Sequence, residues 1–444
     1  MNRKSYIEFL DNWKQSKRRK PLIIRGARQV GKTFLVETWG KRAFKNIISI
    51  NFEKQIDYIE LFELENLEKI ITRLELEHSI KLIGNSESFL FLDEIQFMPK
   101  VLQLLRYFYE DYPEIPVVCT GSLLDFELDD FSYSMPVGRV TFLNMYPLTF
   151  LEFVEAIRGE DYKNMLQTLN WNNRPDSFTH QKLLELLSLY YFVGGMPEAV
   201  ACYTETKDLL EVRKIQLDII ETLKADFGKY GARKHQQLLQ RCFLHAAENI
   251  GRKIKYSHIS REKRSSFVEE VLALLEKARL IKRVYHSGCN RIPLNAEINR
   301  KHFKVIFLDV GLVSAANGLN VLPDPDLMTA LDGVLAEQFV GQEILANNTR
   351  IPDPGLFYWH REAKSSNAEV DYVIQVDQNI IPIEVKSGSS GKLTALKLFR
   401  EEKQAAQIIR VHANLMENPS EENNQITSIP LYMSSRIAEF LNVN

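Results

Sequence analysis

The chain has 444 residues, a length that predicts two to four domains, and 45% of its residues are hydrophobic, enough to build apolar cores. Its 56 Lys and Arg nearly balance its 58 Asp and Glu, so no global charge points to nucleic acid or to a membrane surface. The four cysteines form no C-x-x-C pair, which argues against a disulfide framework or a zinc cluster. Because no stretch approaches the length of a membrane span and the first residues are polar, we expect a soluble cytoplasmic protein.

A glycine-rich segment near the start of the chain matches the phosphate-loop pattern G-x-x-x-x-G-K-T. Residues 21–25 predict a short buried strand before it, and residues 33–39 predict a helix after it. In this context backbone N–H groups face a phosphate, Lys32 reaches the β- and γ-phosphates, and the Thr33 hydroxyl binds Mg²⁺. A simple glycine turn is the alternative. The predicted nucleotide-binding residues are Gly26, Ala27, Arg28, Gln29, Val30, Gly31, Lys32 and Thr33.

Two further apolar runs predict buried parallel strands that end at the same site. Residues 89–92 lead to Asp93 and Glu94. Asp93 would hold Mg²⁺ through its water shell, and Glu94 would polarise the water that attacks the γ-phosphate. A core strand that ends in surface carboxylates is the alternative. Residues 116–120 lead to Ser122, a candidate sensor of the γ-phosphate, although Thr-Gly-Ser is also an ordinary turn.

The order of predicted elements divides the chain into four blocks. Residues 1–150 alternate short strands with helices, which predicts an α/β domain with a parallel sheet. Residues 151–234 show helical spacing and predict a helical extension. Residues 235–310 predict a winged-helix-like domain, and residues 327–444 predict a second α/β domain.

The winged-helix-like block is basic, unlike the chain as a whole. Between residues 251 and 304 there are 14 Lys and Arg against 5 Asp and Glu, a surplus that favours contact with double-stranded DNA. Arg261, Lys263 and Arg264 precede the expected recognition helix and would contact phosphates. A spacer or protein-binding role is the alternative for a block of this kind.

The last block contains a second group of residues that could form a reactive site. Two predicted strands carry Asp371 and the pair Glu384 and Lys386, which alternation places on one face. A predicted helix brings Glu337. Three carboxylates suit Mg²⁺ or Mn²⁺, and Lys386 would position a water or stabilise charge on a phosphate. A structural salt bridge is the alternative for Lys386.

These residues resemble the metal-binding core of restriction-endonuclease-like nucleases. With the phosphate loop and the segments 191–200 and 307–312, nearly the whole chain resembles a family of prokaryotic AAA-type P-loop ATPases with a C-terminal domain of unknown function. The resemblance implies an ATP-hydrolysing domain, a winged-helix segment and a nuclease-like tail, with ATP and Mg²⁺ as cofactors. It implies no settled biological role.

Other expectations follow the resemblance. It makes Arg139 a candidate for the arginine that touches the γ-phosphate, in cis or from a neighbouring subunit, although an arginine that caps a strand explains it equally well. His360 and Arg361 either line the nuclease-like cleft or face solvent. ATP is preferred to GTP on the resemblance, since the sequence has no N-K-x-D segment that would recognise guanine.

Two functions stay open at this point. In the first, ATP hydrolysis gates or loads a nuclease on double-stranded DNA. In the second, the protein is a nucleotide-dependent switch whose C-terminal block is an inactive scaffold for partners. A small-molecule kinase is a weaker third possibility, because it leaves the basic and nuclease-like segments without a role. The sequence predicts no oligomeric state.

Overall fold

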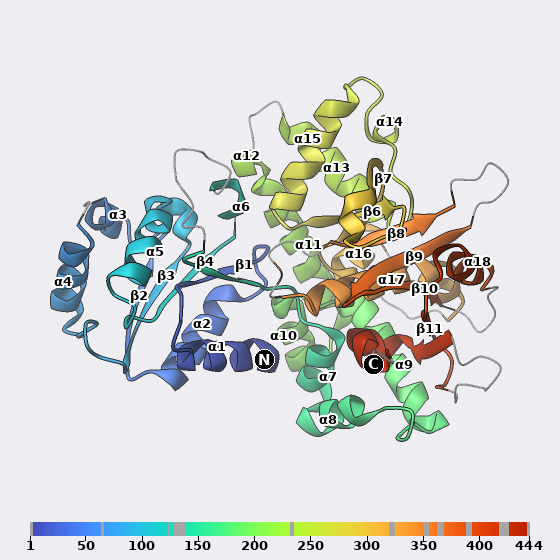
Figure 1. Ribbon diagram of the computed structural model, residues 1–444, viewed down its shortest axis with the longest axis horizontal. Helices are drawn as coiled ribbons and strands as arrows, with labels where there is room; N and C mark the ends of the chain where they lie inside the picture. Colours follow the sequence, from blue (N-terminus) through green and yellow to red (C-terminus); the bar gives the residue numbers. More distant parts are fainter. Residues whose placement is uncertain are drawn as a thin grey trace. The chain divides into compact units, whose positions relative to one another are not determined.

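The structure is a computed structural model that describes residues 3–63, 66–122, 124–127, 138–230, 235–318, 325–349, 351, 355–361, 368–387, 393–416 and 426–441. The chain forms two compact units (Figure 1). One contains residues 2–146 with 349–352, and the other contains residues 147–348 with 353–444. Among the described residues, no helix combines the length and the apolar character that a membrane span needs.

The N-terminal unit is built on a parallel five-stranded sheet with the order β2-β3-β4-β1-β5. The strands β1, β3 and β4 are buried along their whole length, as expected for a parallel sheet that is covered on both faces. The strands are β1 (Leu22–Arg25), β2 (Asn46–Asn51), β3 (Ser88–Asp93), β4 (Val117–Gly121) and β5 (Thr141–Asn144).

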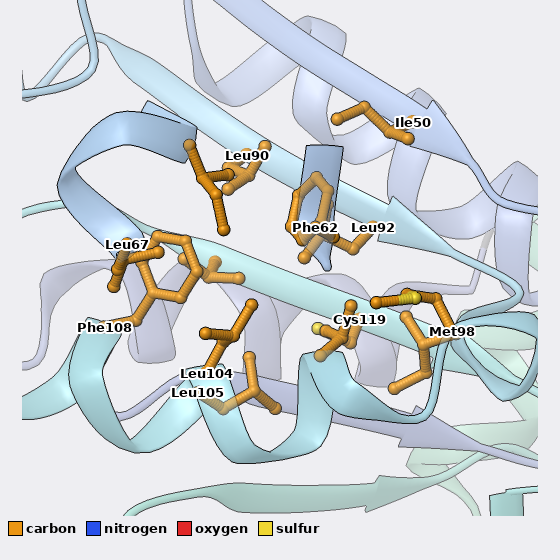
Figure 2. Packing of buried hydrophobic residues seen from close by; sticks show 14 of the residues in the cluster. Ile50, Phe62, Leu67, Leu90, Leu92, Met98, Leu104, Leu105, Phe108 and Cys119 are labelled. Atoms are coloured by element: carbon orange, nitrogen blue, oxygen red, sulfur yellow. The ribbon is translucent and has the colours of Figure 1, made fainter. Parts of the chain in front are cut away.

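Helices pack on both faces of this sheet. Because side chains alternate along a strand, Leu90 and Leu92 of β3 join a core with three helices, shown in Figure 2. On the opposite face, Phe89 packs edge-on against Trp39 with 5.4 Å between ring centroids. The first core contains α3 (Asp57–Phe62), α4 (Leu67–His78) and α5 (Lys100–Glu110), and the second contains α1 (Lys4–Gln15) and α2 (Lys32–Ala43).

The C-terminal unit begins with a helical region. Its first helix starts with a capping box, in which Thr149 and Glu152 satisfy each other's backbone N–H groups. Asp176 and Asp208 cap two later helices. The helices are α7 (Phe150–Arg158), α8 (Glu160–Thr168), α9 (Ser177–Val193), α10 (Pro197–Thr206), α11 (Leu209–Ala225) and α12 (Phe227–Tyr230).

The next block has the element order expected of a winged helix. It contains α13 (Gln236–Glu248), α14 (Tyr256–Ile259), α15 (Ser265–Lys277), β6 (Ile281–Ser287) and β7 (Ile298–Phe307). The hairpin β6–β7 does not end the block, however. β6 also pairs in parallel with β8 (Phe357–His360), with Tyr285 beside Phe357. The border expected between residues 310 and 327 therefore falls inside one continuous sheet.

That sheet has seven strands in the order β12-β11-β10-β9-β8-β6-β7. Tyr372 faces α17 (Pro325–Ala346), where its hydroxyl donates to the Glu337 carbonyl at 2.8 Å, while the next residue, Val373, packs with α18 (Thr394–Lys403). These two helices thus cover opposite faces. The remaining strands are β9 (Glu369–Val376), β10 (Asn379–Lys386), β11 (Ile408–His412) and β12 (Ile426–Pro430).

The segments 191–200 and 307–312 meet around one buried carboxylate, Asp309. The Gly195 N–H donates to Asp309 Oδ2 at 2.6 Å, and Oδ1 caps α16 (Val310–Ala316) through the Leu312 N–H at 3.1 Å. A Cβ at Gly194 would lie 2.1 Å from Asp309 Oδ1, and Gly194 has a φ of +75°. These segments therefore have a packing role.

Candidate functional site

The phosphate loop lies between β1 and α2, as the sequence predicts. Gly31 precedes α2 with a φ of 92°, and Gln29 has a φ of 64°. A Cβ at Gly26 would lie 2.3 Å from the carbonyl oxygen of Met145, so this position has room only for glycine. The N-terminus of the helix that follows supplies the positive end of the helix dipole, which favours a bound phosphate.

Lys32 lies across this loop. Its Nζ donates to the carbonyl oxygens of Gly26 at 3.0 Å and Ala27 at 2.8 Å, and the residue is buried. The ammonium group is thus held over the loop on which the phosphates are expected to lie. The nearby cation and the loop's N–H groups form a site for an anion.

Asp93 lies beside the loop at the carboxyl end of β3 and is the centre of a polar network. Thr33 Oγ1 donates to its Oδ2 at 3.0 Å, Asn51 Nδ2 donates to the same oxygen at 2.8 Å, and Thr120 Oγ1 donates to Oδ1. Asp93 is 2% exposed. A threonine hydroxyl beside a carboxylate is a donor set that fits Mg²⁺. These residues therefore suit the Mg²⁺ of a bound nucleotide.

Glu94 and Ser122 also lie at the carboxyl edge of the sheet. Glu94 has a φ of 54°, and its Oε2 accepts a hydrogen bond from Gln96 Nε2. Ser122 follows β4, and its buried hydroxyl has no hydrogen-bond partner among the described residues. Their roles toward the γ-phosphate stay predictions.

Arg139 lies at the edge of the sheet opposite the phosphate loop. β5 runs parallel to β1, with Thr141 beside Leu22 at the amino end of β1, whereas the phosphate loop follows the carboxyl end. Arg139 precedes β5, and its Nε pairs with Glu110 at 3.1 Å. Strand direction thus separates the backbone of Arg139 from the phosphate loop of the same chain. A contact of Arg139 with the γ-phosphate, in cis or from a neighbouring subunit, stays a prediction.

Sequence reasoning missed several residues of this site. Asn51 and Thr120 contact Asp93. They could have been predicted, because both lie at or near the carboxyl ends of strands next to β3. Arg3 was missed without any motif to find it. Its Nη2 donates to the carbonyl oxygens of Val30 at 3.0 Å and Tyr146 at 2.7 Å. These bonds tie the phosphate loop to the segment that follows β5.

The predicted metal ligands of the C-terminal block each have a partner within the protein. Glu337 pairs with Lys304 at 2.9 Å, Glu384 pairs with Lys386, and Asp371 Oδ2 accepts from the Val385 N–H at 2.8 Å. In the part of the chain that the structure describes, no group of three or more His, Cys, Asp or Glu side chains is arranged to hold a metal ion. Lys304 was not predicted.

Burial dominates the electrostatics of this cluster. It acts to raise the pKa of Glu337 and of Glu384, whereas the neighbouring Lys304 and Lys386 act to lower these pKa values by favouring the charged carboxylates. For Lys386, burial acts to lower the pKa, but the neighbouring Glu384 carboxylate outweighs it and the pKa is raised. The Glu384–Lys386 pair is thus held as a local ion pair.

His360 and Arg361 line a pocket of about 380 Å³ at the end of β8, together with Trp359, His286 and Lys403. None of Glu337, Asp371 and Glu384 lines this pocket. Arg361 is paired with Glu402 at 2.7 Å. The two residues therefore line a cleft, but one without the predicted metal ligands.

Some basic residues of the winged-helix-like block are paired with carboxylates, and others are exposed. Lys253, Lys282, Arg283, Arg291 and Lys304 form ion pairs with carboxylates. Arg261, Lys263 and Arg264 are exposed in the loop before α15. The loop between β6 and β7 also contacts α18, because Lys403 Nζ donates to Asn290 Oδ1 at 2.7 Å.

Three family models match separate parts of the chain. Residues 18–154 match an AAA domain, residues 184–322 match a domain of unknown function, DUF8612, and residues 332–434 match a second domain of unknown function, DUF4143. No curated protein matches the chain.

Several solved structures show a distant likeness. The Walker-type ATPase PABY2304 of Pyrococcus abyssi is 14% identical, with 71% of this chain and 95% of that chain covered and a TM-score of 0.42. The ORC1 protein of Aeropyrum pernix, solved in complex with DNA, is 14% identical over 74% and 92% of the chains, with a TM-score of 0.32. The RuvB Holliday junction branch migration motor of Thermotoga maritima is 16% identical over 63% and 88%, with a TM-score of 0.27. Likeness at these scores supports no conclusion about function.

The family match and the geometry agree on the N-terminal part of the chain. The AAA model spans the phosphate loop, Asp93 and Glu94, and the structure places the loop beside Asp93 in a parallel sheet. Residues 18–154 are therefore an AAA-type P-loop ATPase domain, followed in the chain by two segments of unknown function.

Proposed function

We propose that this chain is a Mg²⁺-dependent ATPase whose nucleotide state switches its C-terminal unit between partner-binding states. The observation that carries the proposal is the network around Asp93, where side chains from α2, β2 and β4 converge beside the phosphate loop. The match of residues 18–154 to an AAA domain supports it.

The expected chemistry follows from the positions of these residues. The loop N–H groups hold the phosphates, and Lys32 exchanges its contacts with the Gly26 and Ala27 carbonyls for phosphate oxygens. Thr33 and Asp93 would hold Mg²⁺, and the bound ion would supply positive charge that neutralises the phosphates. Glu94 orients and polarises the attacking water once its contact with Gln96 is released. These groups act by holding the phosphates, by stabilising their charge and by orienting the water, and none of them forms a covalent intermediate.

The test is ATP hydrolysis by the full chain and by Glu94→Gln, with nucleotide binding measured in parallel. Loss of a general base is expected to lower turnover by roughly 10²–10⁴-fold while ATP still binds. Lys32→Ala should lose binding itself. Glu60→Gln, at an exposed position of α3, is the matched control. Wild-type turnover in Glu94→Gln would show that another group polarises the water.

A specific surface supports double-stranded DNA as the partner of the C-terminal unit. The Ile254 N–H donates to the Phe303 carbonyl at 3.0 Å, so this segment contacts β7. Arg252 and Lys255 on the segment and Lys301 on β7 are all exposed. The exposed loop with Arg261, Lys263 and Arg264 follows the same segment. α15 itself carries Glu269 and Glu270 near its start, so we expect contacts to phosphates rather than base reading by this helix.

Binding to duplex DNA at several salt concentrations tests this surface. Charge reversal of Arg261, Lys263 and Arg264 should weaken binding and flatten the salt dependence, by about 0.9 in log–log slope for each lost phosphate contact. Reversal of Lys17, Arg18 and Lys54, exposed residues of the other unit, changes the net charge equally and is the control. Equal affinities of the two triple variants would contradict the proposal.

A further inference from the structure

Two of the three carboxylates predicted to bind a metal, Glu337 and Asp371, lie instead around a buried lysine. Lys304 of β7 has a side chain that is 3% exposed, with its Nζ 2.9 Å from Glu337 Oε1 and 2.7 Å from Glu369 Oε1. Asp371 Oδ1 lies 3.8 Å from the same nitrogen. The acids come from α17 and β9 and the lysine from a strand of the winged-helix-like block, so the cluster joins the two blocks.

The surroundings leave little room for another cation. Gly251 has a φ of +71°, and a Cβ there would lie 2.5 Å from Glu337 Oε2, so the chain closes tightly over this carboxylate. Lys253 pairs with the second oxygen of Glu369 at 2.9 Å. Buried carboxylates need such partners, because an unpaired buried charge is strongly destabilising. Here two lysines provide the compensation.

The other predicted ligands are also engaged. Asp371 Oδ2 accepts from the Val385 N–H, and Glu384 Oε1 pairs with Lys386. Only the second oxygen of Glu384 is buried without a hydrogen-bond partner among the described residues of this cluster. The described carboxylates of this cluster are not arranged to hold a metal ion together, although Mg²⁺ and Mn²⁺ require several oxygen ligands. A divalent ion would also lie close to the Lys304 ammonium group, which would repel it.

We propose that Lys304 is the resident cation of this carboxylate cluster, in the place that a divalent metal would take in a nuclease-like core. The C-terminal unit then has no metal to activate a water or to stabilise a phosphate, and it does not cleave phosphodiesters. The cluster is a set of ion pairs that joins β7 to α17 and β9. The proposal does not depend on the ATPase activity or on DNA binding.

The test uses MnCl₂ and the nucleotide-free full chain, with retained Mn²⁺ measured from the EPR signal of the free ion. Wild type should retain no Mn²⁺ and show no Mn²⁺-dependent rise in its unfolding midpoint. Lys304→Gln opens the cluster and should gain both, and Lys304→Gln with Asp371→Asn should lose them again. Arg300→Gln, at an exposed position of the same strand, should behave as wild type. A folded Lys304→Gln that gains no Mn²⁺ would overturn the proposal.

Wild type provides a second test that does not rely on Lys304→Gln being able to fold. Plasmid DNA with Mg²⁺ or Mn²⁺ should stay intact, with and without ATP. Mn²⁺ retention or cleavage by wild type that disappears in Asp371→Asn would overturn the proposal, whereas the absence of both supports it. ATP hydrolysis by the same preparations reports on the proposed ATPase separately, so failure of one proposal leaves the other standing.

Discussion

Gly26 is the phosphate-loop residue with the least freedom to change, because a Cβ would lie 2.3 Å from the Met145 carbonyl oxygen. Backbone cannot move aside as a flexible side chain can, so Gly26→Ala should displace the loop. We expect at least a tenfold loss of nucleotide affinity, roughly the effect of losing 1.4 kcal/mol of binding, and a free energy of unfolding lowered by about 1–3 kcal/mol. Fluorescent-nucleotide titration and urea unfolding measure the two effects.

Gly333→Ala is the control for this substitution. Gly333 lies within α17, and the nearest atom to an added Cβ is the Ser387 hydroxyl at 3.8 Å, an ordinary contact. Alanine is the better helix former by about 1 kcal/mol, so this variant should keep nucleotide affinity and unfold no more easily than wild type. Normal nucleotide binding by Gly26→Ala would show that the loop adapts to the extra atom.

Single residues also show what the sequence could and could not predict about the site. Lys32, Thr33 and Asp93 lie where the motifs place them, since parallel strands end at one edge of a sheet. Lys304 could not be identified, because β7 carries Arg300, Lys301 and Lys304 and nothing local distinguishes the buried one. Its side chain is buried by α17 and β9, which are distant in the sequence.

At the scale of elements, the start of α1 supports the phosphate loop through Arg3, the residue that precedes this helix. Its guanidinium donates to Val30 and Tyr146, and Tyr6 of α1 accepts from the Tyr146 N–H at 3.2 Å. Charged hydrogen bonds of this kind are worth about 1.5–3 kcal/mol. Arg3→Ala should therefore raise KM for ATP about tenfold or more, with a smaller change in kcat, because the loop loses its preferred shape before chemistry begins.

Steady-state kinetics of Arg3→Ala, Arg3→Lys and Glu8→Ala test this role of α1. Lysine keeps the charge but cannot donate two hydrogen bonds in the same plane, so Arg3→Lys should recover part of the loss. Glu8 is exposed on the same helix, and its removal should change neither constant. An unaltered KM in Arg3→Ala would mean that the loop holds its shape without this helix.

Pairings between distant elements explain why the block borders were harder to predict than the elements themselves. Capping residues and apolar spacing are local, and helices such as α7 and α11 follow from them. The pairing of β6 with β8 joins residues more than 70 positions apart, and a short β-strand has no local signal for its partner. The blocks 235–310 and 327–444 were therefore expected to be separate, although β6 and β7 belong to the larger sheet.

At the scale of the whole molecule, buried carboxylates link stability to pH. Burial raises the pKa of Glu343 to about 8 and that of Asp309 to about 6. Both values lie above those of an exposed carboxyl group, so between roughly pH 4 and 8 the folded state binds more protons than the unfolded state. The contribution of these groups to stability is complete at low pH and is lost as pH rises through their folded pKa values. As pH rises between the unfolded and folded pKa values of each group, that group lowers the free energy of unfolding by up to about 1.4 kcal/mol per pH unit.

Glu343→Gln isolates this effect within the C-terminal unit. Glu343 Oε1 accepts from the Phe150 N–H at 2.9 Å, a bond that the glutamine oxygen can keep, while the amide has no proton to lose. The free energy of unfolding of the variant should therefore rise relative to that of wild type as pH rises from about 4.5 to 8. Outside this pH range the difference between the two free energies should be constant. Urea unfolding at a series of pH values measures it, with Glu198→Gln at an exposed position of α10 as the control. A pH-independent difference between Glu343→Gln and wild type would mean that Glu343 is charged in the folded protein, with a partner that compensates its burial.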